Sequence, residues 1–320
     1  MGVAKGLPYT FSVVADELAR VQAMIEQELS DCSEPVSGLV RHIGAGRGKM
    51  IRPALVLLSG LSCGGITEEH VRAAAIVEMI HNATLLHDDV VDEGTSRRGV
   101  PTLNRLCGNE SAVLLGDFLL SKVLRLCVGL DGRMAKMIAS AAARTCEGEL
   151  RQIAQRGNWQ ISESEYIGII AEKTAALFGA ACGLGAMLAG ASEPQMQILS
   201  DYGRNTGIAF QITDDLLDLT GDRNKTGKSV GSDLDKGKLT LPMIHLLDTA
   251  GVKAGKTLHA NRRQRAKLLT CLRNNGCLAY AQNRAQEFAQ RAIAALGGIG
   301  ENAGREALIE TARFVVRRTA

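Results

Sequence analysis

The chain has 320 residues, of which 46% are hydrophobic but only 3% are aromatic, so we expect a core of aliphatic side chains and alanine. Its net charge of +3, from 37 basic and 34 acidic residues, is too small to indicate a nucleic-acid partner. None of the eight cysteines belongs to a CxxC pair, which indicates reduced thiols in a cytoplasmic protein rather than disulfides or a zinc site.

Helical periodicity dominates the chain, and the alternation typical of strands is scarce. Ser162 and Glu165 fit a capping box at the start of one helical run. No low-complexity linker or long repeat interrupts the pattern, so we expect one all-α domain over residues 1–320, built as a single large bundle of antiparallel helices. The apolar or amphipathic runs predict helices over residues 72–93, 111–130, 134–156, 163–190, 193–219, 262–274, 278–296 and 301–317.

One stretch resembles a membrane span by length. Residues 174–192 carry no charge, which meets the usual length criterion. The stretch is mostly alanine and glycine, however, with few large aliphatic side chains to favour lipid. We therefore expect a central helix whose small side chains let neighbouring helices approach closely, and no transmembrane segment. The first thirty residues lack the apolar core of a signal peptide.

An acidic pattern, Asp-Asp-x-x-Asp, occurs twice, each time near the C-terminal end of an apolar helix. Helix geometry places its first and last aspartates on one face. Carboxylates crowded in a helical core must take up protons unless cations neutralise them. Oxygen ligands favour Mg²⁺, which takes its remaining ligands from substrate phosphates. The two copies predict a metal-dependent diphosphate site formed by Asp88, Asp89 and Asp92 and by Asp214, Asp215 and Asp218.

Basic residues follow each acidic motif and supply the charges that a diphosphate needs. A single such motif is commonly a solvated helix end, and a single basic loop is usually surface. Two acidic motifs on apolar helices, each followed by basic residues, are hard to explain in that way. The basic residues are Arg97 and Arg98 after the first motif, Lys225, Lys228, Lys236 and Lys238 after the second, and Lys49 and Arg52 in a glycine-rich segment.

These motifs resemble those of the trans-type polyprenyl diphosphate synthases, and most of all the long-chain, octaprenyl-type members. The resemblance runs from about residue 44 to residue 242 and is weaker outside that range. It includes DDxxDxxxxRRG from Asp88 to Gly99, the pair Lys173-Thr174, and Gln211 ahead of the second acidic motif. The GKxxRP element is present, but Met50 stands where the family often has another basic residue.

The resemblance implies an isoprenoid-synthase bundle around a central cavity, in which an allylic diphosphate is joined to isopentenyl diphosphate. It implies that the six aspartates bind about three Mg²⁺ ions, for which Mn²⁺ can substitute. Lys173, Thr174 and Gln211 would steady the allylic cation. The residues that would bind the two diphosphates are Lys49, Arg52, His81, Arg97, Arg98, Lys228 and Lys238.

Product length is expected to depend on the walls of a tunnel that runs along the first acidic helix. Ala83 and Thr84, one turn before Asp88, are small, whereas short-chain members of the family carry aromatic residues at this depth. The candidate floor residues on the following helices are Leu126, Cys127, Met134 and Met137. The resemblance thus implies a long all-trans product, made from a primer that we expect to be farnesyl diphosphate. It also implies a homodimer.

Four alternatives stay open. The chain could be a shorter-chain farnesyl or geranylgeranyl diphosphate synthase, or a class I terpene synthase, although the latter lacks a grip for isopentenyl diphosphate. A metal-dependent phosphohydrolase could use His87 and Asp88, but it would need further histidines in ligand pairs. A non-catalytic subunit of a heteromeric synthase would be free to lose its aspartates, and this chain keeps all six. The basic C-terminus, with Arg313, Arg317 and Arg318, could lie over the site or be solvated, and we expect it to be solvated.

Overall fold

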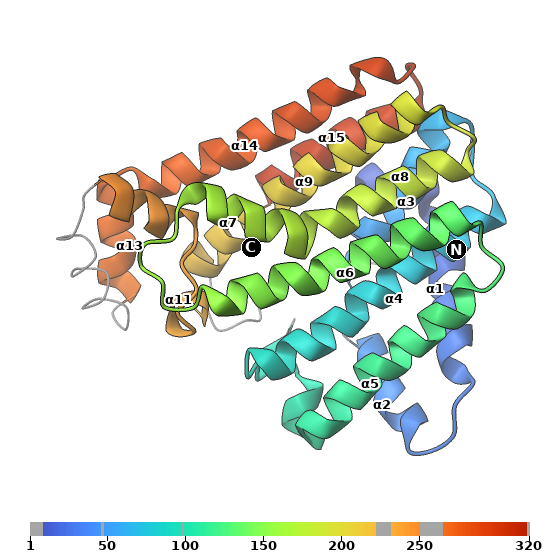
Figure 1. Cartoon of the computed structure of the whole chain (residues 1–320), viewed down its shortest axis with the longest axis horizontal. Helices are drawn as coiled ribbons and strands as arrows, with labels where there is room; N and C mark the ends of the chain where they lie inside the picture. Colours follow the sequence, from blue (N-terminus) through green and yellow to red (C-terminus); the bar gives the residue numbers. More distant parts are fainter. Residues whose placement is uncertain (1–8, 46–47, 98, 222–231, 250–264, 319–320) are drawn as a thin grey trace.

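The structure is a computed structural model that describes residues 9–45, 48–97, 99–221, 232–249 and 265–318. Helices dominate these residues, so the all-α prediction is confirmed. Figure 1 shows α4, α6, α8, α9 and α14 running side by side along the long axis of the bundle.

The first half of the chain contains a 3-10 helix, six α-helices and one strand pair. These elements are η1 (Tyr9–Val14), α1 (Ala15–Ser30), α2 (Val36–Ala45), α3 (Ile51–Cys63), α4 (Glu68–Val91), β1 (Ser96–Arg97), β2 (Val100–Pro101), α5 (Leu103–Cys127) and α6 (Gly132–Ala154). The sequence patterns did not predict α1, α2, α3 or the strands. The strands form an antiparallel hairpin in which Arg97 faces Val100.

In the second half, the run predicted over residues 163–190 is divided by a π-helical turn, η2, and Ser162 and Glu165 form the predicted capping box. The other predicted helices are found with ends shifted by a few residues, except that a kink at Gly108 lets α5 begin earlier. The elements are α7 (Glu163–Ile170), η2 (Ala171–Ala175), α8 (Ala176–Leu188), α9 (Glu193–Thr220), α11 (Ser232–Asp235), α13 (Arg265–Asn274), α14 (Cys277–Ala295), η3 (Leu296–Gly298) and α15 (Ala303–Arg317).

Helix α8 lies at the centre of the bundle because its small side chains allow close approach. A Cβ atom on Gly185 would lie 2.1 Å from the carbonyl oxygen of Val56 in α3. One on Gly203 of α9 would lie 2.4 Å from the carbonyl oxygen of Phe178 in α8. The residues Glu163–Leu188 are long and apolar enough to cross a membrane, but 72% of their most apolar stretch is buried inside the structure, as expected of a core helix.

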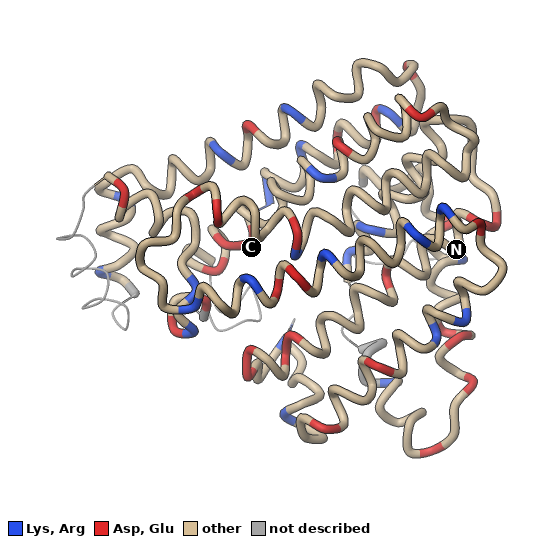
Figure 2. Tube along the Cα trace, in the orientation of Figure 1, with Lys and Arg blue, Asp and Glu red and all other residues tan. Residues whose placement is uncertain are grey.

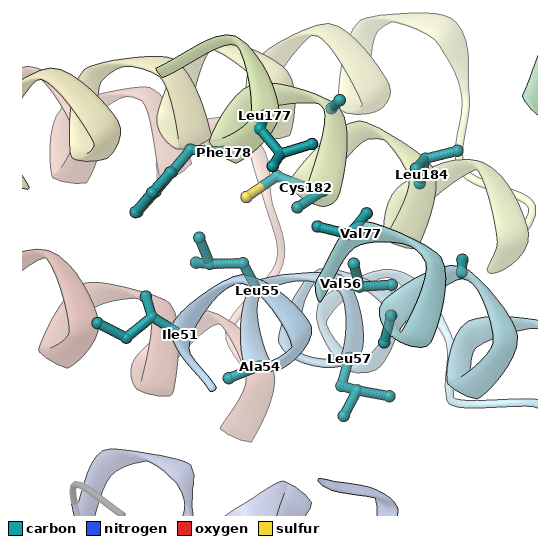
Figure 3. Packing of buried hydrophobic residues seen from close by; sticks show 14 of the residues in the cluster. Ile51, Ala54, Leu55, Val56, Leu57, Val77, Leu177, Phe178, Cys182 and Leu184 are labelled. Carbon is teal, nitrogen blue, oxygen red and sulfur yellow. The ribbon is translucent and has the colours of Figure 1, made fainter. Parts of the chain in front are cut away.

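The main hydrophobic core joins α3, α4 and α8 to α5 and to α1. Figure 3 shows its centre, where Leu177, Phe178 and Cys182 of α8 point toward Leu55 of α3. A second cluster lies between α7, α9 and α14. Together these clusters fix α4, α8 and α9 relative to one another, and thereby the helix ends that carry the two acidic motifs.

Candidate active site

The first acidic motif lies at the C-terminal end of α4, where Asp88 and Asp92 are one turn apart. Burial raises the pKa of Asp88; the Lys173 ammonium opposes this rise, while the carboxylate of Glu149 adds to it. Asp88 Oδ2 lies 3.8 Å from Lys173 Nζ. The site therefore presents a half-buried carboxyl group whose charge depends on a nearby cation.

Asp92 is surrounded by cations from three other segments. Lys238 Nζ donates to both carboxylate oxygens at 2.7 and 2.8 Å. Arg156, at the end of α6, donates at 2.7 Å, and Lys236 Nζ lies 3.6 Å away. Burial alone would raise the pKa of Asp92, but Lys238, Lys236 and Lys173 outweigh it, so the pKa is lowered and the carboxylate stays ionised.

Asp89 points away from these cations and pairs with the hairpin. Arg97 donates to Asp89 through two nitrogens. Its Nη2 lies 2.8 Å from Oδ1, and its Nε lies 3.1 Å from each of the two carboxylate oxygens. The β1–β2 hairpin holds Arg97 in position, and Asn104 Nδ2 donates to the backbone oxygens of Asp89 and Gly94 at 3.1 Å. The loop after α4 is thus tied back onto the helix end.

The second acidic motif lies near the C-terminal end of α9, and each of its aspartates has a different environment. Asp214 accepts a hydrogen bond from Arg318 Nη2 at 3.2 Å. Asp215 is buried and bonds to Tyr166 and Gln211. Asp218 lies 3.5 Å from the backbone nitrogen of Asp233, a weak contact.

One short segment joins the two motifs. Residues 233–238 form a turn in which the backbone N–H of Lys238 donates to the carbonyl of Asp233 at 2.8 Å. The start of this turn contacts Asp218, and its end binds Asp92. The C-terminal ends of α4 and α9 therefore open toward the same group of charges. Figure 2 shows acidic residues at the end of α4, and both acidic and basic residues at α11.

Lys173 lies on the π-helical turn η2. Turns of π-helix within α-helices often occur at functional sites. Its Nζ donates to Gln152 Oε1 at 2.9 Å and pairs with Glu149, both on α6. Burial works against the charged form of Lys173, but Asp88 and Glu149 outweigh burial and raise its pKa. Gly148 allows α6 to approach η2 this closely, because a Cβ atom at Gly148 would lie 2.2 Å from the backbone nitrogen of Lys173.

Lys49 and Arg52, which are predicted to bind the diphosphate of isopentenyl diphosphate, lie over aromatic rings. The Arg52 guanidinium is 4.7 Å from the centre of the Phe178 ring, and Lys49 Nζ is 5.7 Å from that of Phe314. Phe178 is 5.3 Å from Phe210, whose other neighbour is the Arg318 guanidinium at 4.0 Å. Arg52 and Arg318 thus approach the same aromatic pair.

The expectation of a solvated C-terminus is wrong for Arg318, whose side chain is only 9% exposed against Phe210 and Asp214. Arg317 is exposed, as expected. His81 is half-buried, one turn before Thr84 and Leu85. Arg98 and Lys228, as well as Lys225, lie outside the described residues.

His87 points away from Asp88. Its ring contacts α5, with Nε2 3.2 Å from the carbonyl oxygen of Val113 and 3.5 Å from Asp117. It packs directly over Gly116. A phosphohydrolase would need His87 and Asp88 to bind one metal ion, but the two side chains point in different directions.

Oxygen donors from the ends of α4 and α9 match the ligand preference of a hard divalent ion. Within the described part of the chain, no three His, Cys, Asp or Glu side chains converge closely enough to hold a metal by themselves. The set fits Mg²⁺ if substrate phosphates complete the coordination, the usual manner of Mg²⁺ binding. Asp88, Asp92, Asp214 and Asp218 are the side chains whose positions suit this best.

Five of the six predicted tunnel residues are packed in or against the main core. Ala83 is fully buried, and Thr84 donates to the carbonyl of His81 at 2.8 Å. Met137 lies beside Gly183 of α8. The remaining three are Leu126, Cys127 and Met134, of which Met134 is buried. Predicted tunnel residues of α4, α5 and α6 thus border the same hydrophobic core, and their role in a tunnel stays a prediction.

Sequence reasoning missed several side chains that contact the predicted site residues. Glu149 and Gln152 lie on α6 and Arg156 lies in the turn just after it, and their spacing of three to four residues was a usable signal. Tyr166 and Arg318 gave no comparable signal, because their partners are 49 and 104 residues away.

A helical bundle that gathers two acidic helix ends with lysines and arginines has the architecture of the isoprenoid synthases. The family profile described as polyprenyl synthetase matches residues 33–273. The chain belongs to this family and is a prenyltransferase of the trans-polyprenyl diphosphate synthase type.

Similar proteins support this assignment over nearly the whole chain. Octaprenyl diphosphate synthase of Escherichia coli is 36% identical over 313 residues, covering 96% of this chain and 97% of that protein. A geranyl-diphosphate-specific all-trans-nonaprenyl-diphosphate synthase of Rhodobacter capsulatus is also 36% identical, covering 95% and 96%. A polyprenyl synthase of Caulobacter crescentus, solved with calcium and isoprenyl diphosphate, superimposes with a TM-score of 0.91 at 33% identity and 97% coverage of both chains.

Proposed function

We propose that this enzyme condenses isopentenyl diphosphate with an allylic diphosphate, farnesyl diphosphate, to form a longer all-trans polyprenyl diphosphate and pyrophosphate. The observation that carries the proposal is the turn at residues 233–238, which contacts Asp218 with one end and Asp92 with the other. Two acidic helix ends that face one group of lysines can hold one allylic diphosphate between them. The Caulobacter relative, solved with calcium and isoprenyl diphosphate, supports a divalent ion and a substrate of this kind.

In this proposal the aspartates of both motifs hold about three Mg²⁺ ions on the allylic diphosphate. The bound ions would neutralise the leaving group as its carbon–oxygen bond ionises. Arg156, Lys236 and Lys238 then lie where their charges reach the outer phosphate oxygens. Arg97 supports the site from the hairpin, and Lys228 is proposed to close it. Mn²⁺ is expected to substitute for Mg²⁺.

On the hydrocarbon side, Lys173, Thr174 and Gln211 would face the allylic cation. Thr174 and Gln211 are partners in a hydrogen bond of 2.8 Å, so their oxygen atoms form one polar patch in an otherwise apolar wall. Fixed dipoles of this kind stabilise a cation without giving it a nucleophilic water. We propose that Lys49, Arg52, His81 and Arg98 bind the diphosphate of isopentenyl diphosphate.

The last step is loss of a proton from the new tertiary cation. No carboxylate or imidazole has been assigned to this step, and we propose that the departing pyrophosphate takes the proton. Residues that hold the pyrophosphate in place, such as Lys238, would then also position the base. This keeps the proton transfer inside the closed site.

We propose a long product because Ala83 and Thr84, one turn before Asp88 on α4, have small side chains, with Leu126, Cys127, Met134 and Met137 further on as candidate floor residues. The relatives include synthases named for octaprenyl, nonaprenyl and short-chain products, so the family alone does not set the length. A farnesyl or geranylgeranyl diphosphate synthase is the alternative product class.

We further propose that the enzyme is a cytoplasmic homodimer. The eight cysteines are free thiols, which supports a reducing compartment. Leu114 and Leu124 of α5 are 67% and 70% exposed, Val128 just after α5 is 77% exposed, and Leu150 of α6 is 65% exposed. Exposed aliphatic side chains of this kind are suited to pairing with a second copy.

The test is incubation of purified protein with labelled isopentenyl diphosphate, farnesyl diphosphate and Mg²⁺. The proposal predicts an elongated prenol after dephosphorylation and no turnover in excess chelator. A cyclised hydrocarbon would indicate a terpene synthase, and free phosphate a phosphohydrolase. Absence of any product would leave the non-catalytic subunit. Asp92→Asn serves as the control that removes a proposed metal ligand but changes the shape of the side chain little.

A further inference from the structure

The middle aspartate of the second motif differs from its neighbours. Asp215 is 6% exposed, and both of its carboxylate oxygens are already bonded to protein donors. Tyr166 of α7 donates its hydroxyl hydrogen to Oδ2 at 2.6 Å, and Gln211, one turn earlier in α9, donates Nε2–H to Oδ1 at 2.8 Å. By contrast, the side chain of Asp214 is 34% exposed.

The hydrogen bonds continue from Asp215 toward the polar patch that we place beside the allylic cation. The side-chain amide oxygen of Gln211, Oε1, accepts a hydrogen bond from the Thr174 hydroxyl at 2.8 Å. Four side chains from α7, η2 and α9 thus form one chain, in the order Tyr166, Asp215, Gln211 and Thr174. Tyr166 is itself 3% exposed, so water does not compete for its hydroxyl.

The chain has a direction because its members are not interchangeable as donors and acceptors. Both Asp215 oxygens accept in this arrangement, so the amide group of Gln211 turns its NH₂ toward Asp215 and its oxygen toward Thr174. The Thr174 hydroxyl then donates its hydrogen to the side-chain oxygen of Gln211. The lone pairs of the Thr174 oxygen remain for the substrate, and they are the end of the hydroxyl dipole that stabilises a cation.

We propose that Asp215 and Tyr166 are positioning residues that set the direction of the Gln211 amide and the Thr174 hydroxyl, rather than metal ligands. In the second acidic motif, Asp214 and Asp218 would then bind the metal ions on the diphosphate. Asp215 would act on the side of the reacting hydrocarbon, by positioning Gln211 and Thr174. This inference rests on the proposed function for its catalytic part. It revises the assignment of Asp215 to the metal ions.

Two isosteric substitutions test the proposal. Tyr166→Phe removes one donor and keeps the ring, and Asp215→Asn lets the new amide donate to Gln211 and reverse it. Each should lower kcat about ten- to a hundredfold, the effect of losing one oriented hydrogen bond, with KM for both substrates within about threefold. Tyr202→Phe is the matched control, because Tyr202 is equally buried and its hydroxyl donates to the carbonyl of Leu308 at 2.6 Å. It should keep the wild-type kcat.

A binding measurement separates this inference from the proposed function. Mn²⁺ affinity, measured by calorimetry in the presence of inorganic pyrophosphate, should be unchanged in Asp215→Asn and weakened in Asp214→Asn. Equal weakening in both variants would make Asp215 a metal ligand and overturn the proposal, as would a wild-type kcat in Tyr166→Phe. If the wild-type protein forms no prenol, the proposed function fails, and the Mn²⁺ comparison still decides the role of Asp215.

Discussion

Replacement of Gly148 by alanine should separate Lys173, which we propose to be catalytic, from its partners on α6. Gly148 lies where α6 crosses the π-helical turn, and a Cβ atom there would be 2.2 Å from the Lys173 nitrogen, 2.7 Å from its Cα and 2.9 Å from the carbonyl carbon of Glu172. These are backbone atoms, so no flexible side chain can move aside. Because ordinary contact begins at 3.4 Å, the two elements must separate by about 1.2 Å.

That separation is large compared with the contacts it affects. The hydrogen bond from Lys173 Nζ to Gln152 measures 2.9 Å, and an added 1.2 Å would break it. We expect a fall in kcat of about 100-fold, which a displacement of about 1 Å can cause. Overpacking should also lower the free energy of unfolding by about 1–3 kcal/mol, offset in part by the better helix propensity of alanine, about 1 kcal/mol.

The assay is steady-state prenyl transfer with labelled isopentenyl diphosphate, together with urea unfolding of the same samples. Gly132→Ala is the matched control, because Gly132 begins the same helix and a Cβ there meets no other atom within 4 Å. The control should turn over normally and be as stable as wild type or slightly more stable. Wild-type kcat and stability in Gly148→Ala would show that the approach of α6 to η2 does not position Lys173.

Three further predictions concern stability and product length. Arg318→Ala should lower the free energy of unfolding by about 1–3 kcal/mol, since it removes a buried partner of Asp214, whereas exposed Arg317→Ala should change it by less than about 0.5 kcal/mol; equal effects would contradict the buried pairing. Burial lowers the pKa of His70 below its usual 6.5. Just below pH 6.5, His70 therefore binds a proton in the unfolded chain but stays neutral in the folded chain. Stability should therefore fall as pH drops below about 6.5, and urea titrations at pH 7 and pH 5 should show a smaller difference in His70→Gln. Ala83→Phe should shorten the product; an unchanged chain length on chromatography, in protein shown to be folded, would remove Ala83 from the tunnel wall.

The helical core could be predicted because its signal is local. Apolar residues recur every three to four positions along α4, α6 and α9, and Ser162 with Glu165 marks a helix start within four residues. The π-helical turn at Lys173 could not be predicted in this way, since it changes the backbone hydrogen bonds without changing the apolar pattern. The β1–β2 hairpin was missed because strands of two residues show no alternation.

The candidate site was predictable in its residue types but not in its pairings. The two acidic motifs stand out in the sequence because charged residues rarely interrupt an apolar helix. Which cation each aspartate binds depends on contacts between distant segments. Lys238 and Asp92 are 146 residues apart. The expectation that Arg318 is solvated failed for the same reason, since nothing near it in the sequence reveals Phe210 and Asp214 as neighbours.

The pairings also bear on how the site changes its occupants. Asp92 is neutralised by Lys238, Arg156 and Lys236, and each of these cations is a group that a diphosphate would bind. If Mg²⁺ takes the carboxylate as proposed, the same cations are released where the phosphate oxygens arrive. Neither set of charges is then left buried without a partner, which would cost several kcal/mol per ion. The close spacing of aspartates and basic residues follows from this exchange, because a site that must be neutral both empty and filled needs both kinds of charge within one contact distance.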